Sequence, residues 1–276
     1  MSQLWDPFQF EFFRNGLLVA TLAGGLCGLV GTYVVLRGMS YLGHGLSHAV
    51  FGGAAASAVV GLNFFLGAGL WGVASALAIG RVARRRSIGG DAAIGVITTA
   101  SFALGLALFA LFGQARRNPE ALLFGSILGV GGLDVAVMAA VAAFAGLAIF
   151  LGYRPLLFTT FDPEVADASG VRTGRVDALL MLVLAVSILA TIKVVGAVLV
   201  AAALVIPATV ARMVTRSFAR TLWLATVIGA TCGFAGMIVS YHLDISPGAS
   251  IVLAAALVFG VVYASTGARG LSAMRA

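Results

Sequence analysis

One uncharged stretch of the sequence is too long and too apolar for a soluble domain. From Leu42 to Gly80, 39 residues pass without an Asp, Glu, Lys or Arg, and Arg81 then ends the stretch. About 20 apolar residues cross the hydrocarbon core of a bilayer as a helix. The stretch therefore predicts two membrane spans, with a turn at the Gly-Leu-Asn sequence of residues 61–63.

Seven further apolar runs divide the rest of the chain into candidate spans. They lie at about Gly16–Leu36, Ala92–Phe112, Val135–Gly152, Ala178–Ile192, Val194–Ala211, Thr221–Tyr241 and Ser250–Thr266. The chain is also 61% hydrophobic and 10% charged, with a mean hydropathy of +1.08. We therefore expect an all-α polytopic membrane protein with about nine (eight to nine) transmembrane helices, in which residues 1–276 form a single integral-membrane domain.

The Gly-rich segment between Asn118 and Leu133, NPEALLFGSILGVGGL, is apolar but too short to cross a bilayer comfortably. A re-entrant or short interfacial helix suits it better, provided that protein surrounds any irregular backbone.

The net charge of +7 does not indicate nucleic-acid binding, because the arginines cluster at the ends of apolar runs. If Arg37 faces the cytoplasm, the nine spans place thirteen basic residues on that side and four on the other. Cytoplasmic loops of membrane proteins carry such an excess of Lys and Arg. The pattern predicts an N-terminus outside the cell, a cytoplasmic C-terminus and no nucleic-acid partner.

The largest polar insertion on the predicted cytoplasmic side runs from Phe158 to Asp177. Within it, Asp162 can cap a short helix, Pro163 suits its first position, Glu164 favours its positive dipole end and Gly170 can end it. The insertion is either a solvated connection or a compact helix for a cytoplasmic partner to bind.

Two histidines, His44 and His48, lie four residues apart inside the first of the two spans in the uncharged stretch. This spacing places both imidazoles on one face of a helix, where they can bind one ion. Imidazole nitrogen suits zinc, copper, iron and nickel. The alternative is a pair of core histidines that hydrogen-bond to backbone carbonyls, although ionisable groups within spans commonly mark functional sites.

The pair lacks the features of a hydrolytic enzyme. The zinc proteases that place two histidines at this spacing carry a glutamate between them as general base, whereas Gly45, Leu46 and Ser47 separate His44 and His48. An intramembrane metalloenzyme is therefore a weak alternative, and a non-transporting membrane protein is another. The chain also lacks a Walker A sequence, so the energy for active transport would come from a separate subunit.

The third histidine, His242, ends a span two residues before Asp244 on the predicted outer face. These side chains could give an incoming cation one nitrogen and one carboxylate ligand. The alternative is a pair of interfacial groups in contact with water.

Six segments of the chain, taken in order, resemble the permease subunits of bacterial ABC importers for zinc, manganese and iron. The segment RGMSYLGHGLSHAVFGGAA resembles the hallmark of this family. The others are GGDAAIGVITTASFALGLAL, LLFGSILGV, FDPEVADASGV, VVGAVLVAAALVIPATVARM and SYHLDISPGASIVLAAAL. Together they span nearly the whole chain.

The resemblance implies a fold like that of the vitamin B12 importer permease and a location in the bacterial plasma membrane. It also implies a homodimer of permeases, two cytoplasmic ATPase subunits and an extracytoplasmic solute-binding protein that delivers the metal. No cofactor is expected to stay bound. The segment at about 158–177 would couple to the ATPase through Phe161, Asp162, Pro163, Glu164, Asp167 and Gly170.

The sequence departs from many members of this family at His44, where they carry an aspartate. A nitrogen pair in place of an oxygen and a nitrogen favours Zn²⁺ over Mn²⁺. We therefore expect Zn²⁺ as the transported ion, with manganese or iron as the alternatives within the family. Because protonated imidazole cannot bind a metal, uptake should fall on acidification.

Overall fold

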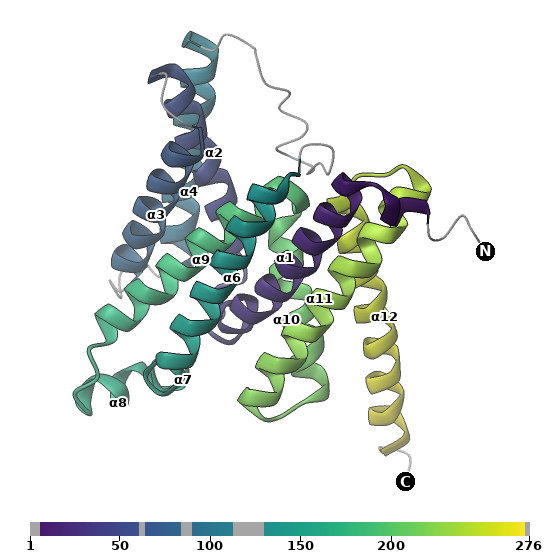
Figure 1. Ribbon diagram of the computed structural model, residues 1–276. Coiled ribbons are helices and arrows are strands. Elements are labelled where there is room, and N and C mark those ends of the chain that lie inside the picture. Colours follow the sequence, from purple (N-terminus) through teal and green to yellow (C-terminus); the bar gives the residue numbers. More distant parts are fainter. Residues whose placement is uncertain (1–5, 61–63, 84–89, 113–129, 274–276) are drawn as a thin grey trace.

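The computed structural model describes residues 6–60, 64–83, 90–112 and 130–273, and these residues contain helices and turns but no strand (Figure 1). The helices are η2 (Asp6–Gln9), α1 (Glu11–Leu36), α2 (Leu42–Val60), α3 (Phe64–Ala83), α4 (Gly90–Phe112), α6 (Gly132–Leu151), α7 (Tyr153–Phe161), α8 (Pro163–Ala168), α9 (Thr173–Val195), α10 (Val200–Val214), α11 (Phe218–Leu243) and α12 (Pro247–Ala273). The all-helical fold agrees with the apolar runs of the sequence.

Seven of the described helices are long and apolar enough to cross a membrane, namely α1, α3, α4, α6, α9, α11 and α12. The other two predicted spans fall on α10, a shorter apolar helix of 15 residues, and on α2, which has 19 residues. Two histidines and four glycines lower the hydropathy of α2. Seven of the nine predicted spans therefore correspond to described helices that are long and apolar enough to cross a membrane. The count of nine is not confirmed.

Helix α1 lies at the centre of the bundle, and α11, α10, α6 and α9 pack around it. Within its most apolar stretch of 18 residues, 72% are buried. Glycines allow the closest of these contacts. A Cβ atom added to Gly28 or to Gly24 would overlap the backbone of α11, and one added to Gly31 would overlap the backbone of Leu204 in α10. Small residues commonly let membrane helices approach in this way.

The chain turns between α9 and α10 at a place that the apolar pattern does not mark. Helix α9 continues to Val195, and Gly196 then takes a φ of 85° before α10 begins at Val200. Glycine adopts positive φ without the steric cost that a Cβ imposes. The predicted boundary between Ile192 and Val194 was therefore wrong by several residues.

The two ends of the bundle carry different elements. Helices α7 and α8 and the C-terminal end of α12 lie at the lower end in Figure 1, whereas α1 begins and α11 ends near the upper end. Part of the polar insertion predicted over 158–177 belongs to longer helices, because α7 continues to Phe161 and α9 begins at Thr173. Most of the segment expected as a re-entrant helix, and the turn at 61–63, lie outside the described residues.

Candidate metal site

The structure brings His44 and His48 together on the first turns of α2. Their Nε2 atoms lie 3.2 Å apart, and the rings meet edge to face with centroids separated by 4.5 Å. Both side chains are half-buried. The four-residue spacing therefore produces the shared face that the sequence predicts.

Two glycines beside the histidine pair allow α2 to pack closely against α4 and α10. A Cβ atom on Gly45 would come within 2.7 Å of Thr98 Cγ2 and 2.9 Å of Ile94 Cγ2, both in α4. One on Gly43 would lie 2.8 Å from Leu204 Cδ1 in α10. These two positions keep the start of α2 between α4 and α10, so the imidazoles are held inside the helix bundle.

The two rings are surrounded mainly by aromatic side chains. His48 packs against Phe102 of α4 at 4.8 Å between ring centroids, and His44 packs against Tyr41 at 5.5 Å. Among the described residues, neither imidazole hydrogen-bonds to a backbone carbonyl, and each has only the other as a polar partner. Core histidines held by carbonyls, the alternative left open by the sequence, do not match this arrangement.

The separation of the two nitrogens suits one shared ion. Zinc–nitrogen bonds of about 2.0–2.1 Å at a tetrahedral angle place two ligand nitrogens ~3.3 Å apart. Without a metal, the same separation allows a hydrogen bond in which one neutral ring donates to the other. Because the described residues contain no cluster of three or more His, Cys, Asp or Glu, this chain offers the ion an incomplete ligand set. An incomplete set favours release.

His242 and Asp244 lie elsewhere, at the end of α11. Both are exposed, and the His242 ring packs against Tyr241 at 5.6 Å. Asp244 caps the helix in a left-handed conformation, with φ 53° and ψ 43°, which Asp adopts more readily than most residues. The structure does not join these two residues to His44 and His48 in a ligand cluster within the described part of the chain.

A cleft of ≈ 720 Å³ opens beside the start of α2. It is lined by Gly38, Ser40, Tyr41, Asp91, Ala201, Ala202 and Val205. Asp91 lies in the first turn of α4 and forms no hydrogen bond or ion pair with another described residue. A carboxylate at the start of a span commonly has only a solvated or capping role. The structure instead places Asp91 in the same cleft as Tyr41, whose ring contacts His44.

Helix α8 forms as its capping residues predict. The Asp162 carboxylate accepts a hydrogen bond from the Val165 N–H at 3.0 Å, Pro163 occupies the first turn, and Gly170 follows with a φ of 84°. Thr173 Oγ1 donates to the Asp167 carboxylate at 3.3 Å. The cap fixes a short helix that projects at the lower end of the bundle (Figure 1).

The exposed side chains of this region include large apolar groups. Phe161 is 62% exposed and Val165 is 48% exposed, whereas Ala166 is buried against the rest of the protein. Glu164 and Pro163 are exposed as well. An exposed apolar side chain on a capped helix, such as Val165 on α8, is suited to contact with another protein.

Comparisons with known proteins agree with this architecture. The model of the ABC 3 transport family matches residues 9–266. The "Manganese transport system membrane protein MntC" of Halalkalibacterium halodurans is 38% identical over 92% of this chain and 87% of its own length. The "Probable iron transport system membrane protein" of Haemophilus influenzae is 34% identical over 95% of this chain and 96% of its own length.

A solved structure, PsaBC from Streptococcus pneumoniae in complex with Fab, matches with a TM-score of 0.84 and 33% identity over 95% of both chains. The family match spans residues 9–266, which include α2 and α8. The chain therefore belongs to the ABC 3 transport family and is a multi-pass membrane permease of a bacterial metal ABC importer, a subunit that is not catalytic by itself.

Proposed function

We propose that this permease carries Mn²⁺ into the cell and that the His44–His48 pair binds the ion during passage. The observation that carries the proposal is the 3.2 Å separation of two imidazole nitrogens on a helix inside the bundle. The pair is close enough to share one ion, and its ligand set is incomplete enough to release it.

The relatives decide the order of the candidate ions. Zinc, which the nitrogen pair led us to expect, finds no support among the relatives described above, whose names refer to manganese and iron. Manganese is therefore the first candidate substrate. Iron is the second, because the name of one relative refers to it. Zinc is the third, and it rests only on the nitrogen ligands at both positions, which bind Zn²⁺ more strongly than Mn²⁺ in the general order of metal affinities.

The proposed complex has the partners that the family resemblance implies. Two copies of the permease would form the path, cytoplasmic ATPase subunits would bind α8, and an extracytoplasmic binding protein would deliver the ion to the opposite end. The positions of α8 and of the C-terminal end of α12, both at the lower end in Figure 1, support a cytoplasmic assignment for that end. The N-terminus would then lie outside.

Metal uptake in cells tests this function. A bacterial strain without its own manganese, iron and zinc importers would express the chain with its ATPase and binding protein, and initial uptake of each radioactive metal would be measured. We expect manganese uptake that falls about tenfold or more in His48→Ala, as commonly follows damage to a metal site. Thr231→Ala, an exposed polar change in α11, serves as the control. Absence of uptake of any metal by the complete wild-type complex would refute the proposal.

A further inference from the structure

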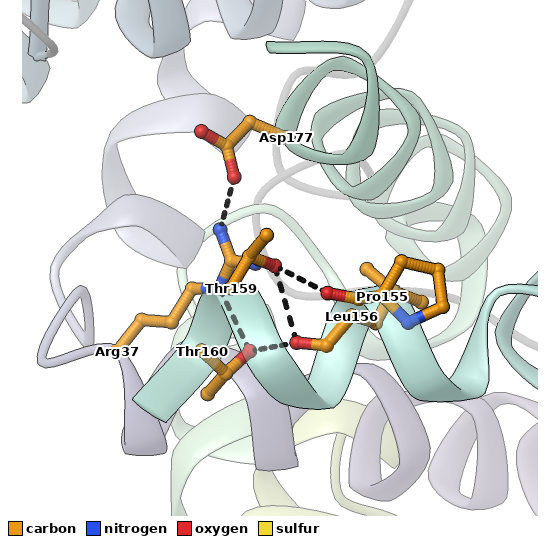
Figure 2. A network of polar contacts seen from close by, with 6 residues as sticks. All are labelled: Arg37, Pro155, Leu156, Thr159, Thr160 and Asp177. Atoms are coloured by element: carbon orange, nitrogen blue, oxygen red, sulfur yellow. Dashed lines mark hydrogen bonds and ion pairs between the residues drawn. The ribbon is translucent and has the colours of Figure 1, made fainter. Parts of the chain in front are cut away.

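The side chain of Arg37, which caps the C-terminal end of α1, bonds to two further helices, α7 and α9 (Figure 2). Its Nη1 forms an ion pair with Asp177 Oδ1 of α9 at 2.7 Å. Its Nε and Nη2 donate to the hydroxyls of Thr160 and Thr159 in α7, at 3.1 and 2.9 Å. The Arg37 side chain is only 10% exposed. All three nitrogens of the guanidinium thus hold a defined partner.

The two threonines are themselves fixed by the backbone of α7. The Thr160 hydroxyl donates to the Leu156 carbonyl at 2.6 Å, and the Thr159 hydroxyl donates to the Pro155 carbonyl at 2.9 Å (Figure 2). Each hydroxyl has one hydrogen, so these bonds leave its lone pairs directed to accept from the guanidinium. The three acceptors, Asp177, Thr159 and Thr160, form a fork that a planar guanidinium can bond to at once. The single ammonium of lysine cannot reach all three with the same geometry.

The network joins the two helices that flank α8 in the chain. Helix α7 ends at Phe161, directly before α8, and α9 begins at Thr173, shortly after it. Arg37 therefore holds the helices on both sides of α8. It is also the residue that directly follows α1 as its C-terminal cap, seven positions before His44. One side chain thus connects the flanks of the candidate ATPase-binding helix with the segment that leads into the candidate metal-binding helix.

We propose that Arg37 is a positioning residue that transmits the position of α8 to the start of α2, so that movement of a docked ATPase reaches the His44–His48 pair. The inference rests on the function proposed above, because it assumes an ATPase at α8 and a metal at the histidines. Arg37 touches neither partner. Its role is to keep α7, α9 and the α1–α2 connection moving as one unit.

The purified complete complex, reconstituted in vesicles, tests the proposal by the ratio of metal imported to ATP hydrolysed. Arg37→Lys keeps the positive charge but loses the simultaneous bonds to the three acceptors. We expect the ratio to fall at least about fivefold in this variant, which is the lower end of the effects that coupling between two sites commonly produces. ATP hydrolysis should stay within about twofold of wild type, because α8 and its cap are unchanged. Asp177→Asn gives a second, uncharged disruption of the same network.

The chain supplies a matched control in a second ion pair. Lys193 Nζ of α9 lies 2.6 Å from Asp134 Oδ2 of α6, with both side chains about as exposed as Asp177. Lys193 is at the end of α9 farthest from α8, so Lys193→Gln should leave the ratio of import to hydrolysis at the wild-type value.

The reverse pair Arg37→Asp with Asp177→Arg cannot restore the threonine contacts and should remain uncoupled. The proposal is overturned if both Arg37→Lys and Asp177→Asn keep the wild-type ratio, or if import and hydrolysis fall in equal proportion in both, as a purely structural role requires. A wild-type complex that hydrolyses ATP but imports no metal would instead refute the proposed function.

Discussion

The Nε2 atoms of His44 and His48 face each other at 3.2 Å on adjacent turns of α2. Neither ring has another polar partner within the described residues. A pair of nitrogens held at this separation and facing away from backbone carbonyls is available to an ion. If the proposed site is correct, the ligand atom at position 44 should influence which ion binds best.

Replacing the nitrogen at position 44 with oxygen should change metal preference. We expect His44→Asp to raise the ratio of manganese to zinc uptake by about tenfold, because carboxylate oxygen suits Mn²⁺ and imidazole nitrogen suits Zn²⁺. Competition between the two radioactive metals in the same cells measures the ratio directly. His44→Asn, which offers a neutral oxygen, separates charge from ligand type. An unchanged ratio in both variants would mean that position 44 does not contact the ion.

Acidification should inhibit uptake through the same pair. A protonated imidazole has no lone pair for a metal, so protons and Mn²⁺ compete for both Nε2 atoms. Uptake should therefore fall as the medium is acidified below neutral pH, and raising the pH again should restore it. ATP hydrolysis measured at each pH separates this effect from inhibition of the ATPase. His44→Asp should show a shallower dependence over this range, because only one imidazole remains; equal profiles would contradict the histidine site.

Asp91 should assist the ion after it leaves the histidines. The carboxylate lines the cleft of ≈ 720 Å³ that is also lined by Tyr41, whose ring contacts His44, so a cation that left His44 through this cleft would pass a negative charge. We expect Asp91→Asn to lower the maximal uptake rate several-fold while the apparent affinity for metal changes little, because a released cation loses the attraction of the carboxylate. Glu11→Gln, an exposed acid in the first turn of α1, is the control. A raised half-saturation concentration with an unchanged maximal rate would place Asp91 outside this step.

The local features of the site follow from sequence because they depend on neighbours in the chain. The four-residue spacing of His44 and His48 fixes their shared helix face, and Asp162 and Pro163 fix the start of α8. Apolar runs likewise predict the helices. The end of α9 is different, since Gly196 interrupts an apolar segment without any change in polarity.

Contacts between distant segments could not be predicted in the same way. Arg37 and Asp177 lie 140 positions apart, and either charge alone resembles any charge at the end of a span. Asp91 lines the same cleft as Tyr41 in a region where α2 packs against α4, and Gly45 allows α2 to approach Ile94 and Thr98 closely. Such pairings depend on which helices become neighbours, and the hydrophobicity of a span does not encode its neighbours.

The exposed apolar side of α8 should be required for ATPase binding. Val165 is 48% exposed next to the buried Ala166, so a charge at position 165 would face outward without entering the bundle. We expect Val165→Asp to reduce co-purification of the ATPase at least about tenfold, since burying an unpaired carboxylate in an interface costs several kcal/mol. The permease itself should remain folded, as judged by its elution as a single species in detergent. Asp162→Ala, which removes the cap and about 1 kcal/mol of helix stability, should weaken binding less. If Val165→Asp retains the ATPase at the wild-type level, α8 is not its binding surface.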